Sequence, residues 1–269
     1  MSGTQLARVA SVDNWCSLSE AERAALLLHE KPFIIKKMVE HWPLVEAGKH
    51  SFARLAEYLS QFDSGLVFDA MIAAPQEQGR LFYRDTMDRF NFEHMKGYLS
   101  DALKILRELE GRDNPPAFYI GSKKISEYLP GLERECVIGE LPVQIQPNIW
   151  VGNSVNVATH NDNFENVACV AVGRRRFTLF PPEQEENLYI THRQDTPGGR
   201  PISVVNLQRP DFTQYPKFRK AIETAQVAEL DAGDALYMPK CWWHNVESIS
   251  DVNILVNFWW QGATPTFNE

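Results

Sequence analysis

This 269-residue sequence contains few cysteines and no paired cysteine motif. Its four cysteines, Cys16, Cys136, Cys169 and Cys241, are widely spaced and include no Cys-x-x-Cys pair. Neither a disulfide scaffold nor a cysteine-based zinc site is therefore indicated. We expect reduced thiols, as in the cytoplasm.

Long apolar runs and an excess of basic residues are also missing. Residues 1–15 lack a basic segment followed by an apolar one, and no stretch approaches the ~18 apolar residues of a spanning helix. We therefore expect a cytoplasmic protein without a membrane partner. With 27 Lys and Arg against 35 Asp and Glu, the net charge is −8, so we also expect no nucleic-acid partner.

The first 115 residues show helical patterns separated by short strand patterns. A capping-box pattern at residues 17–20 precedes a helix that runs to residue 29, and Ser51 opens a second helix over 52–62. The longest helical pattern covers residues 91–109. Strands are predicted at 32–37, 65–70 and 80–84.

After residue 116 the pattern changes to many short strands rich in β-branched and aromatic residues. The predicted strands cover residues 117–120, 144–151, 156–160, 166–172, 175–180, 201–205, 226–230, 235–238, 242–247 and 252–260, with short helices at 123–129 and 217–224. Such a series is typical of a double-stranded β-helix, or jelly roll. We predict a mainly β protein with helices (α+β), in which residues 1–269 form a single domain. Residues 1–115 would be a helix-rich part packed around a jelly-roll core at 116–261.

A His-x-Asp pair is the first candidate for chemistry. His160 and Asp162 are two residues apart, so in a strand they point to the same face. His244 follows a turn and a late strand that could return to this pair. Two histidines and one carboxylate form the facial triad of non-haem Fe(II) oxygenases. The alternatives are a loop-capping pair and a histidine of the core.

Polar residues also interrupt apolar strands. If Phe177 faces the barrel interior, the period of two places Arg175 inside as well, with Arg174 and Arg176 outside. A guanidinium inside a barrel is costly unless it meets an anion. The alternative is a shifted register that leaves all three arginines at a hairpin tip.

Asn257 is likewise an amide within an apolar strand, and Asn166 and Tyr119 could add donors to the same pocket. Buried amides need hydrogen-bond partners. Each of these residues could instead be an ordinary buried polar residue that is satisfied by the backbone.

Three segments of the sequence, residues 149–182, 233–248 and 256–259, resemble the cupin-like JmjC family of Fe(II)/2-oxoglutarate-dependent oxygenases. The resemblance covers residues 32–261 and is strongest after residue 149. Within the family, the chain is most similar to asparaginyl hydroxylases of the factor-inhibiting-HIF type.

The resemblance implies that His160, Asp162 and His244 ligate Fe(II). It places Arg175 where relatives use a lysine to bind the distal carboxylate of 2-oxoglutarate. The further residues that it implies near the cosubstrate are Tyr119, Thr159, Asn166 and Asn257, and those near the substrate are Trp243 and Trp259. Relatives have a cosubstrate-binding threonine three residues before the first ligand, where this sequence has Val157.

The implied function is that of a hydroxylase that uses Fe(II), 2-oxoglutarate and O2, acts on a peptide, protein or small molecule, and releases succinate and CO2. The alternatives are an inactive cupin binding module and a metal-dependent cupin enzyme that does not use 2-oxoglutarate. Relatives continue into C-terminal helices that form a dimer, whereas this sequence stops at Glu269. Either the sequence is C-terminally truncated, or a homodimer would form through another contact.

Overall fold

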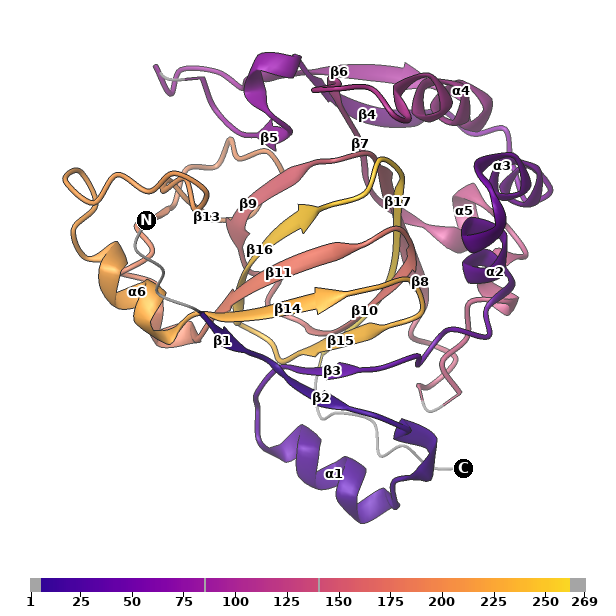
Figure 1. Cartoon of the computed structure of the whole chain (residues 1–269), viewed down its shortest axis with the longest axis horizontal. Coiled ribbons are helices and arrows are strands. Elements are labelled where there is room, and N and C mark those ends of the chain that lie inside the picture. Colours follow the sequence, from indigo (N-terminus) through magenta and orange to yellow (C-terminus); the bar gives the residue numbers. More distant parts are fainter. Residues whose placement is uncertain (1–5, 85, 140, 262–269) are drawn as a thin grey trace.

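The computed structural model describes residues 6–84, 86–139 and 141–261, and two β-sheets that face each other form its centre (Figure 1). Residues 262–269 at the end of the predicted single domain, and the first five of residues 1–15, lie outside the described residues. The mainly β fold with helices and the jelly-roll core are as predicted.

One sheet carries the His-x-Asp strand. Its spatial order is β1 (Ala7–Arg8), β14 (Gln226–Leu230), β11 (Arg175–Phe180), β16 (Trp243–Ser248), β9 (Asn156–His160), β13 (Ile202–Ser203) and β12 (Ile190–Thr191), with β5 (Arg80–Leu81) beside β9.

The opposite sheet carries the strand with Asn257. Its order is β2 (Ala10–Val12), β3 (Phe33–Ile35), β15 (Ala235–Met238), β10 (Glu165–Val172), β17 (Asn253–Trp260), β8 (Pro147–Gly152), β7 (Ala117–Lys124), β4 (Phe68–Ala73) and β6 (Phe92–Gly97).

The helices lie outside these sheets (Figure 1). They are α1 (Glu20–Leu28), α2 (Pro43–His50), α3 (Phe52–Ser60), α4 (Leu99–Leu109), α5 (Ile125–Tyr128) and α6 (Phe218–Thr224). Short 3-10 turns occur at Trp15–Ser17, Pro75–Glu77, Leu132–Arg134 and Pro182–Gln184. No helix in the described ranges is long and apolar enough to cross a membrane.

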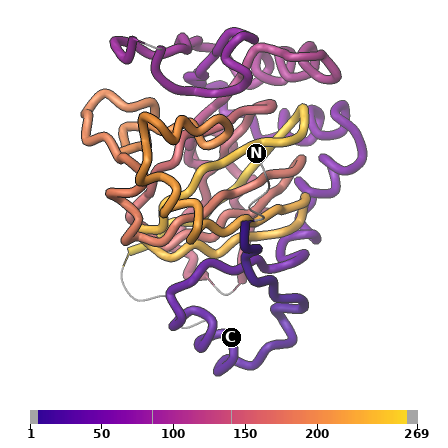
Figure 2. The backbone as a smooth tube through the Cα atoms, turned by 60° about the vertical axis from the view of Figure 1, so that its left-hand side comes forward, coloured from indigo at the N-terminus to yellow at the C-terminus, as the bar shows by residue number. Residues whose placement is uncertain are grey.

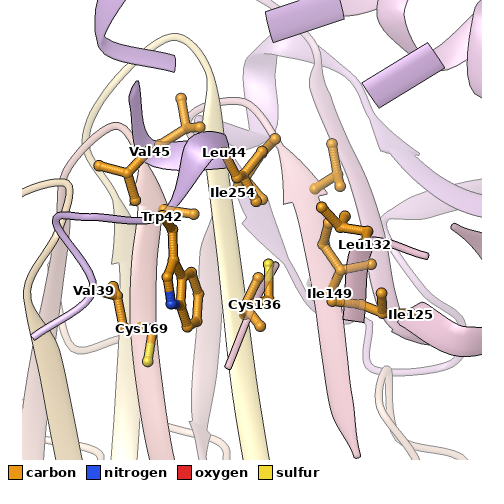
Figure 3. Close-up of a cluster of buried hydrophobic side chains, with 14 of the residues drawn as sticks. Val39, Trp42, Leu44, Val45, Ile125, Leu132, Cys136, Ile149, Cys169 and Ile254 are labelled. Atoms are coloured by element: carbon orange, nitrogen blue, oxygen red, sulfur yellow. The ribbon is translucent and has the colours of Figure 1, made fainter. Parts of the chain in front are cut away.

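Strand alternation separates the barrel interior from an outer core. On β10, Ala168 and Val170 face the interior, whereas Cys169 faces outward. The outer cluster packs under α2, where the buried Trp42 ring lies near Cys169 and Cys136 (Figure 3). Trp42 also meets Phe258 of β17 edge-on, with ring centroids 6.3 Å apart. Apolar packing on both faces of the sheet that contains β10 and β17 therefore holds these two strands in place.

Most strands of the second half match their predictions. Four of them, β9, β11, β14 and β15, have the predicted bounds, β7 and β10 extend beyond the predicted residues, and β8, β13, β16 and β17 differ from their predictions by a few residues. The four cysteines are free, as expected.

The helix predicted at 91–109 is wrong in its first half. Residues Phe92–Gly97 form β6, which pairs antiparallel with β4, and α4 begins only at Leu99. The apolar spacing fits a helix, but the pairing with β4 overrides it. The predicted capping box is also displaced by two residues: Ser19 caps α1 and its N–H donates to the Glu22 carboxylate.

The first half of the chain contributes strands to both sheets, in addition to the helices that lie outside them. The strand β3 lies between β2 and β15, while β4 and β6 extend the sheet beyond β7. Figure 2 shows violet and purple segments of this half both above and below the barrel strands. The sequence did not predict α2, β1, β2, β6 or β12.

Candidate metal centre and its cavity

His160, Asp162 and His244 come together at one end of the barrel. Their candidate ligand atoms all lie within 4.8 Å of one another. His160 Nε2 is 3.9 Å from Asp162 Oδ1, and His244 Nε2 is 3.5 Å from Asp162 Oδ2. Ligands about 2.1 Å from one metal at right angles are about 3 Å apart, so these three side chains could close around an ion with small movements.

The strand register explains why the two histidines meet. His160 ends β9 and stands opposite His244 of the antiparallel neighbour β16. Side chains at such paired positions share a face of the sheet and lie close together. The ring centroids are 4.4 Å apart.

Backbone carbonyl groups orient both imidazoles. His160 Nδ1 lies 2.8 Å from the Ala158 carbonyl oxygen, and His244 Nδ1 lies 3.1 Å from that of Trp242. A carbonyl oxygen only accepts, so each Nδ1 carries the proton and donates it. Both Nε2 lone pairs are therefore free for a metal, as in histidine–metal sites with a supporting second contact.

The charge state also suits a metal. Burial lowers the pKa of His160 to about 4, with the neighbouring His244 adding to the shift and Asp162 opposing it. Burial alone would raise the pKa of Asp162, but a side-chain hydrogen bond with His244 and electrostatic interactions with His160, His244 and Arg200 lower it to about 2. Near pH 7 the site thus offers a neutral His160 and an ionised Asp162, the forms that bind metals.

The triad opens into a cavity of about 340 Å³ inside the barrel. Its lining is mostly apolar, with Val157, Phe177 and Leu255 among the walls. A mostly apolar cavity with a few polar groups that converge is typical of small-molecule sites.

Arg175 points into this cavity and is 2% exposed. Its Nε and Nη2 atoms find no hydrogen-bond partner among the residues that the structure describes. The flanking Arg174 and Arg176 face outward instead, where they pair with carboxylates such as Asp231 and Glu229. A buried guanidinium with unpaired donors fits an anionic ligand.

Tyr119 lies beside Arg175 in the same cavity. Burial raises the pKa of this phenol to about 12, although the Arg175 charge lowers it in part. The hydroxyl is therefore protonated near pH 7, and it can donate a hydrogen bond to the ligand of Arg175.

Asn257 and Asn166 form a buried polar pair on the opposite wall. Asn257 Nδ2 donates to Asn166 Oδ1 over 3.2 Å, and Trp150 Nε1 donates to Asn257 Oδ1 over 2.7 Å. All three residues line the cavity. The indole contact fixes which way the Asn257 amide faces.

The model of the cupin-like domain family matches residues 19–265. This chain belongs to the cupin-like family. The chain is 33% identical over 115 residues to the lysine-specific demethylase JMJ31 of Arabidopsis thaliana, a match that covers 42% of this chain and 20% of that protein. It is 35% identical over 116 residues to human HSPB1-associated protein 1, with 42% and 23% of the two chains covered.

A longer match joins this cupin-like chain to the human bifunctional peptidase and (3S)-lysyl hydroxylase JMJD7. The two are 25% identical over 263 residues, 86% of this chain and 77% of that protein. The first two relatives are matched over only about a fifth to a quarter of their own length. These relatives confirm the resemblance to JmjC proteins, and a demethylase and a hydroxylase are among them. The likeness to asparaginyl hydroxylases stays a prediction.

Most of the predicted site residues of this cupin-like chain lie around one cavity. Those that line it are Tyr119, His160, Asp162, Asn166, Arg175, His244, Asn257 and Trp259. The predicted orientation of the arginine triplet is also confirmed, since Arg175 alone of the three faces the interior.

Two predicted site residues lie elsewhere, so their assignment is corrected. Trp243 is buried in a separate cluster with Phe180 and Phe218, and its Nε1 donates to the Pro182 carbonyl. Thr159 is buried, but it is not among the described residues that line the cavity. Both are neighbours of metal-site histidines on a strand, where adjacent side chains point to opposite faces.

The sequence did not predict all residues that line the cavity, and Trp150 and Arg200 are two of those it missed. Trp150 lies on β8 opposite Leu255, and its place in the predicted apolar strand was the available signal. Arg200 lies in a loop just before β13, and no local pattern marks it as part of the site. Loops carry no periodicity, so only tertiary structure reveals such residues.

Proposed function

We propose that this protein is an Fe(II)- and 2-oxoglutarate-dependent oxygenase that hydroxylates a peptide or protein side chain or a small molecule. The observation that carries the proposal is the pairing of a His-Asp-His triad with a buried arginine that has unpaired donors, both in one cavity. The metal needs the triad, and a dicarboxylate cosubstrate needs the arginine.

The donor set fits the metal. Two imidazoles and one carboxylate leave neighbouring positions open on an octahedral ion, and Nε2 of each histidine is the free atom. When bound, such a metal with 2-oxoglutarate supplies the coupling of O2 reduction to decarboxylation, with succinate and CO2 released and a substrate C–H bond hydroxylated.

The protein's own residues would bind and orient the cosubstrate and the substrate. Arg175 would hold the distal carboxylate of 2-oxoglutarate in a two-pronged contact, with the Tyr119 hydroxyl as an added donor. Asn166 and Asn257 would orient polar groups near the metal. The Leu255 and Phe177 walls would exclude water, which strengthens each polar contact in the cavity.

Trp259 would form part of the substrate entrance. It lines the cavity and stacks on Phe164, with ring centroids 6.0 Å apart. The hydroxylase among the relatives supports a protein side chain as substrate. We further propose that residues 1–269 form one domain and that the protein is cytoplasmic, since its free cysteines suit a reducing compartment.

The first test is metal binding by the triad. His160→Ala removes a neutral imidazole ligand and should lower affinity for Fe(II), measured anaerobically by calorimetry, by at least about 100-fold. The matched control is His94→Ala, because His94 lies on β6 and pairs with Asp69 at the surface. Undiminished affinity in His160→Ala would refute the triad.

The second test measures binding and turnover of 2-oxoglutarate. Wild-type protein with Fe(II), ascorbate and 2-oxoglutarate should bind the cosubstrate and form succinate slowly without added substrate. Binding without any turnover on a substrate panel would favour an inactive binding module. Metal binding without 2-oxoglutarate binding would favour a cupin enzyme of another chemistry.

A further inference from the structure

A short segment before β13 is held beside the metal centre at both ends. Upstream, the Tyr83 hydroxyl donates to the Asp195 carbonyl over 2.7 Å. Downstream, Ile202 of β13 stands opposite His160 in the sheet. Arg200 lies two residues before Ile202, and both line the cavity. The position of Arg200 next to the metal ligands is therefore set by the sheet itself.

Arg200 lines the cavity and is half-buried, which places it at the solvent-accessible end that we call the mouth. It lies over the Phe164 ring, 5.7 Å from its centroid, and Phe164 in turn stacks on Trp259. It also acts electrostatically on both His160 and Asp162. No ion pair among the described residues includes Arg200. It is thus a partly buried cation at the mouth without a carboxylate partner in that part of the chain.

The side chains that line the cavity also carry an excess of positive charge. Among the described residues that line it, Asp162 is the one carboxylate, whereas Arg175 and Arg200 are both cations. A divalent metal and a 2-oxoglutarate dianion would cancel each other, so one positive charge would remain. In a partly dehydrated cavity this charge repels a cation and attracts an anion more strongly than it would in water.

We infer that Arg200 selects a substrate that presents a carboxylate at the cavity mouth, as in an acidic residue of a peptide, and that it disfavours a lysine side chain there. The inference rests on the proposed function and names the substrate class for the same site. Arg200 is a specificity-determining residue in this account, and a role in binding 2-oxoglutarate is assigned to Arg175 instead.

The test compares three pools of fluorescein-labelled nonapeptides with randomised flanks and Glu, Gln or Lys at the centre. Affinity is measured by fluorescence anisotropy under argon, with the protein loaded with Fe(II) and 2-oxoglutarate. Wild type should bind the Glu pool about tenfold more tightly than the Gln pool, and the Lys pool least. Arg200→Gln should abolish the difference, and Arg200→Glu should favour the Lys pool.

The matched control is Arg193→Gln. Arg193 belongs to the same loop but is paired with Asp195 over 2.6 Å, and it should leave the preference for Glu unchanged. Competition by N-acetylglutamate against N-acetylglutamine decides whether a small acid suffices or a peptide is needed. Affinity for 2-oxoglutarate, measured in parallel, should be the same in wild type and Arg200→Gln.

Equal affinity of wild type for the Glu and Gln probes, both peptide and small, would overturn the inference, as would a preference that persists in Arg200→Gln. These outcomes differ from failure of the proposed function, which would appear as wild type that does not bind 2-oxoglutarate. In that case the anisotropy series on metal-free protein still reports whether Arg200 reads a carboxylate.

Discussion

Arg175 shows how one residue can serve a site at the expense of stability. Its guanidinium is 2% exposed, and its Nε and Nη2 atoms have no partner among the described residues. A charge in such a place costs free energy of folding unless it is paired. The residue is understandable only if an anion binds there, because an apolar side chain of similar volume would pack in the barrel without this cost.

Replacement of Arg175 should therefore separate stability from binding. We expect Arg175→Met to raise the free energy of unfolding of the metal-free protein by about 1–4 kcal/mol in urea denaturation. The same change should lower affinity for 2-oxoglutarate, measured by calorimetry, by about 100-fold. A less stable protein with intact cosubstrate affinity would contradict both the assignment and its physical reason.

Arg176 provides the matched control for this pair of measurements. It faces outward on β11 and pairs with Glu229 and Glu247. Arg176→Met should leave 2-oxoglutarate affinity unchanged and alter stability by about 1 kcal/mol or less, since partly exposed ion pairs contribute little.

At the scale of the element, the turn between β10 and β11 determines which arginine enters the barrel. Gly173 has φ +79°, and a Cβ there would lie 2.4 Å from the Val252 carbonyl oxygen and 2.7 Å from Asn253 Oδ1. Only glycine fits such a left-handed and crowded position without strain. The turn carries the chain from β10 in one sheet to β11 in the other, and the point at which β11 begins places Arg175 inside the barrel.

Gly173→Ala should therefore lower the free energy of unfolding by about 2–4 kcal/mol, because it combines a strained backbone with a steric clash. Chemical denaturation measures this change. Gly139→Ala is the control, since its Cβ would meet nothing within 4 Å and its φ is not positive. Equal stability of the two variants would refute the role of the turn.

At the scale of the whole molecule, the N-terminal part and the barrel share sheets and a core. Trp42 precedes α2, is 1% exposed, and donates from Nε1 to the Val137 carbonyl over 3.0 Å. Its ring packs against Phe258 of β17, the strand that also carries Asn257. Contacts of this kind connect the first 115 residues to the strands that hold the site.

Trp42→Ala should lower the free energy of unfolding by about 3–5 kcal/mol, as is usual when a large aromatic side chain is removed from a core. The proposal of one domain adds that far-UV and near-UV circular dichroism should report a single coincident transition in both wild type and variant. Two separate transitions in wild type would contradict that proposal.

Local patterns were sufficient for the barrel strands and for most of the site. Strand patterns are a strong signal in β11, where polar and apolar residues alternate, and in β15, which is a short apolar run buried on both faces. The His160 and Asp162 spacing and the buried polar positions Arg175 and Asn257 could be read in the same way, since an apolar strand tolerates such residues only with a partner. The signal was weak in β6, an edge strand whose apolar spacing also fits a helix.

What the sequence by itself determined is thus the fold class, the three residues proposed to bind the metal and the residues that break the apolar alternation. The reason is that period and burial act along a single strand. Only the tertiary structure decided that Trp243 and Thr159 face away from the cavity, that Trp150 orients Asn257, and that Arg200 reaches the metal centre. These facts depend on strand register and on a loop without periodicity, and both are set by contacts between segments far apart in the chain.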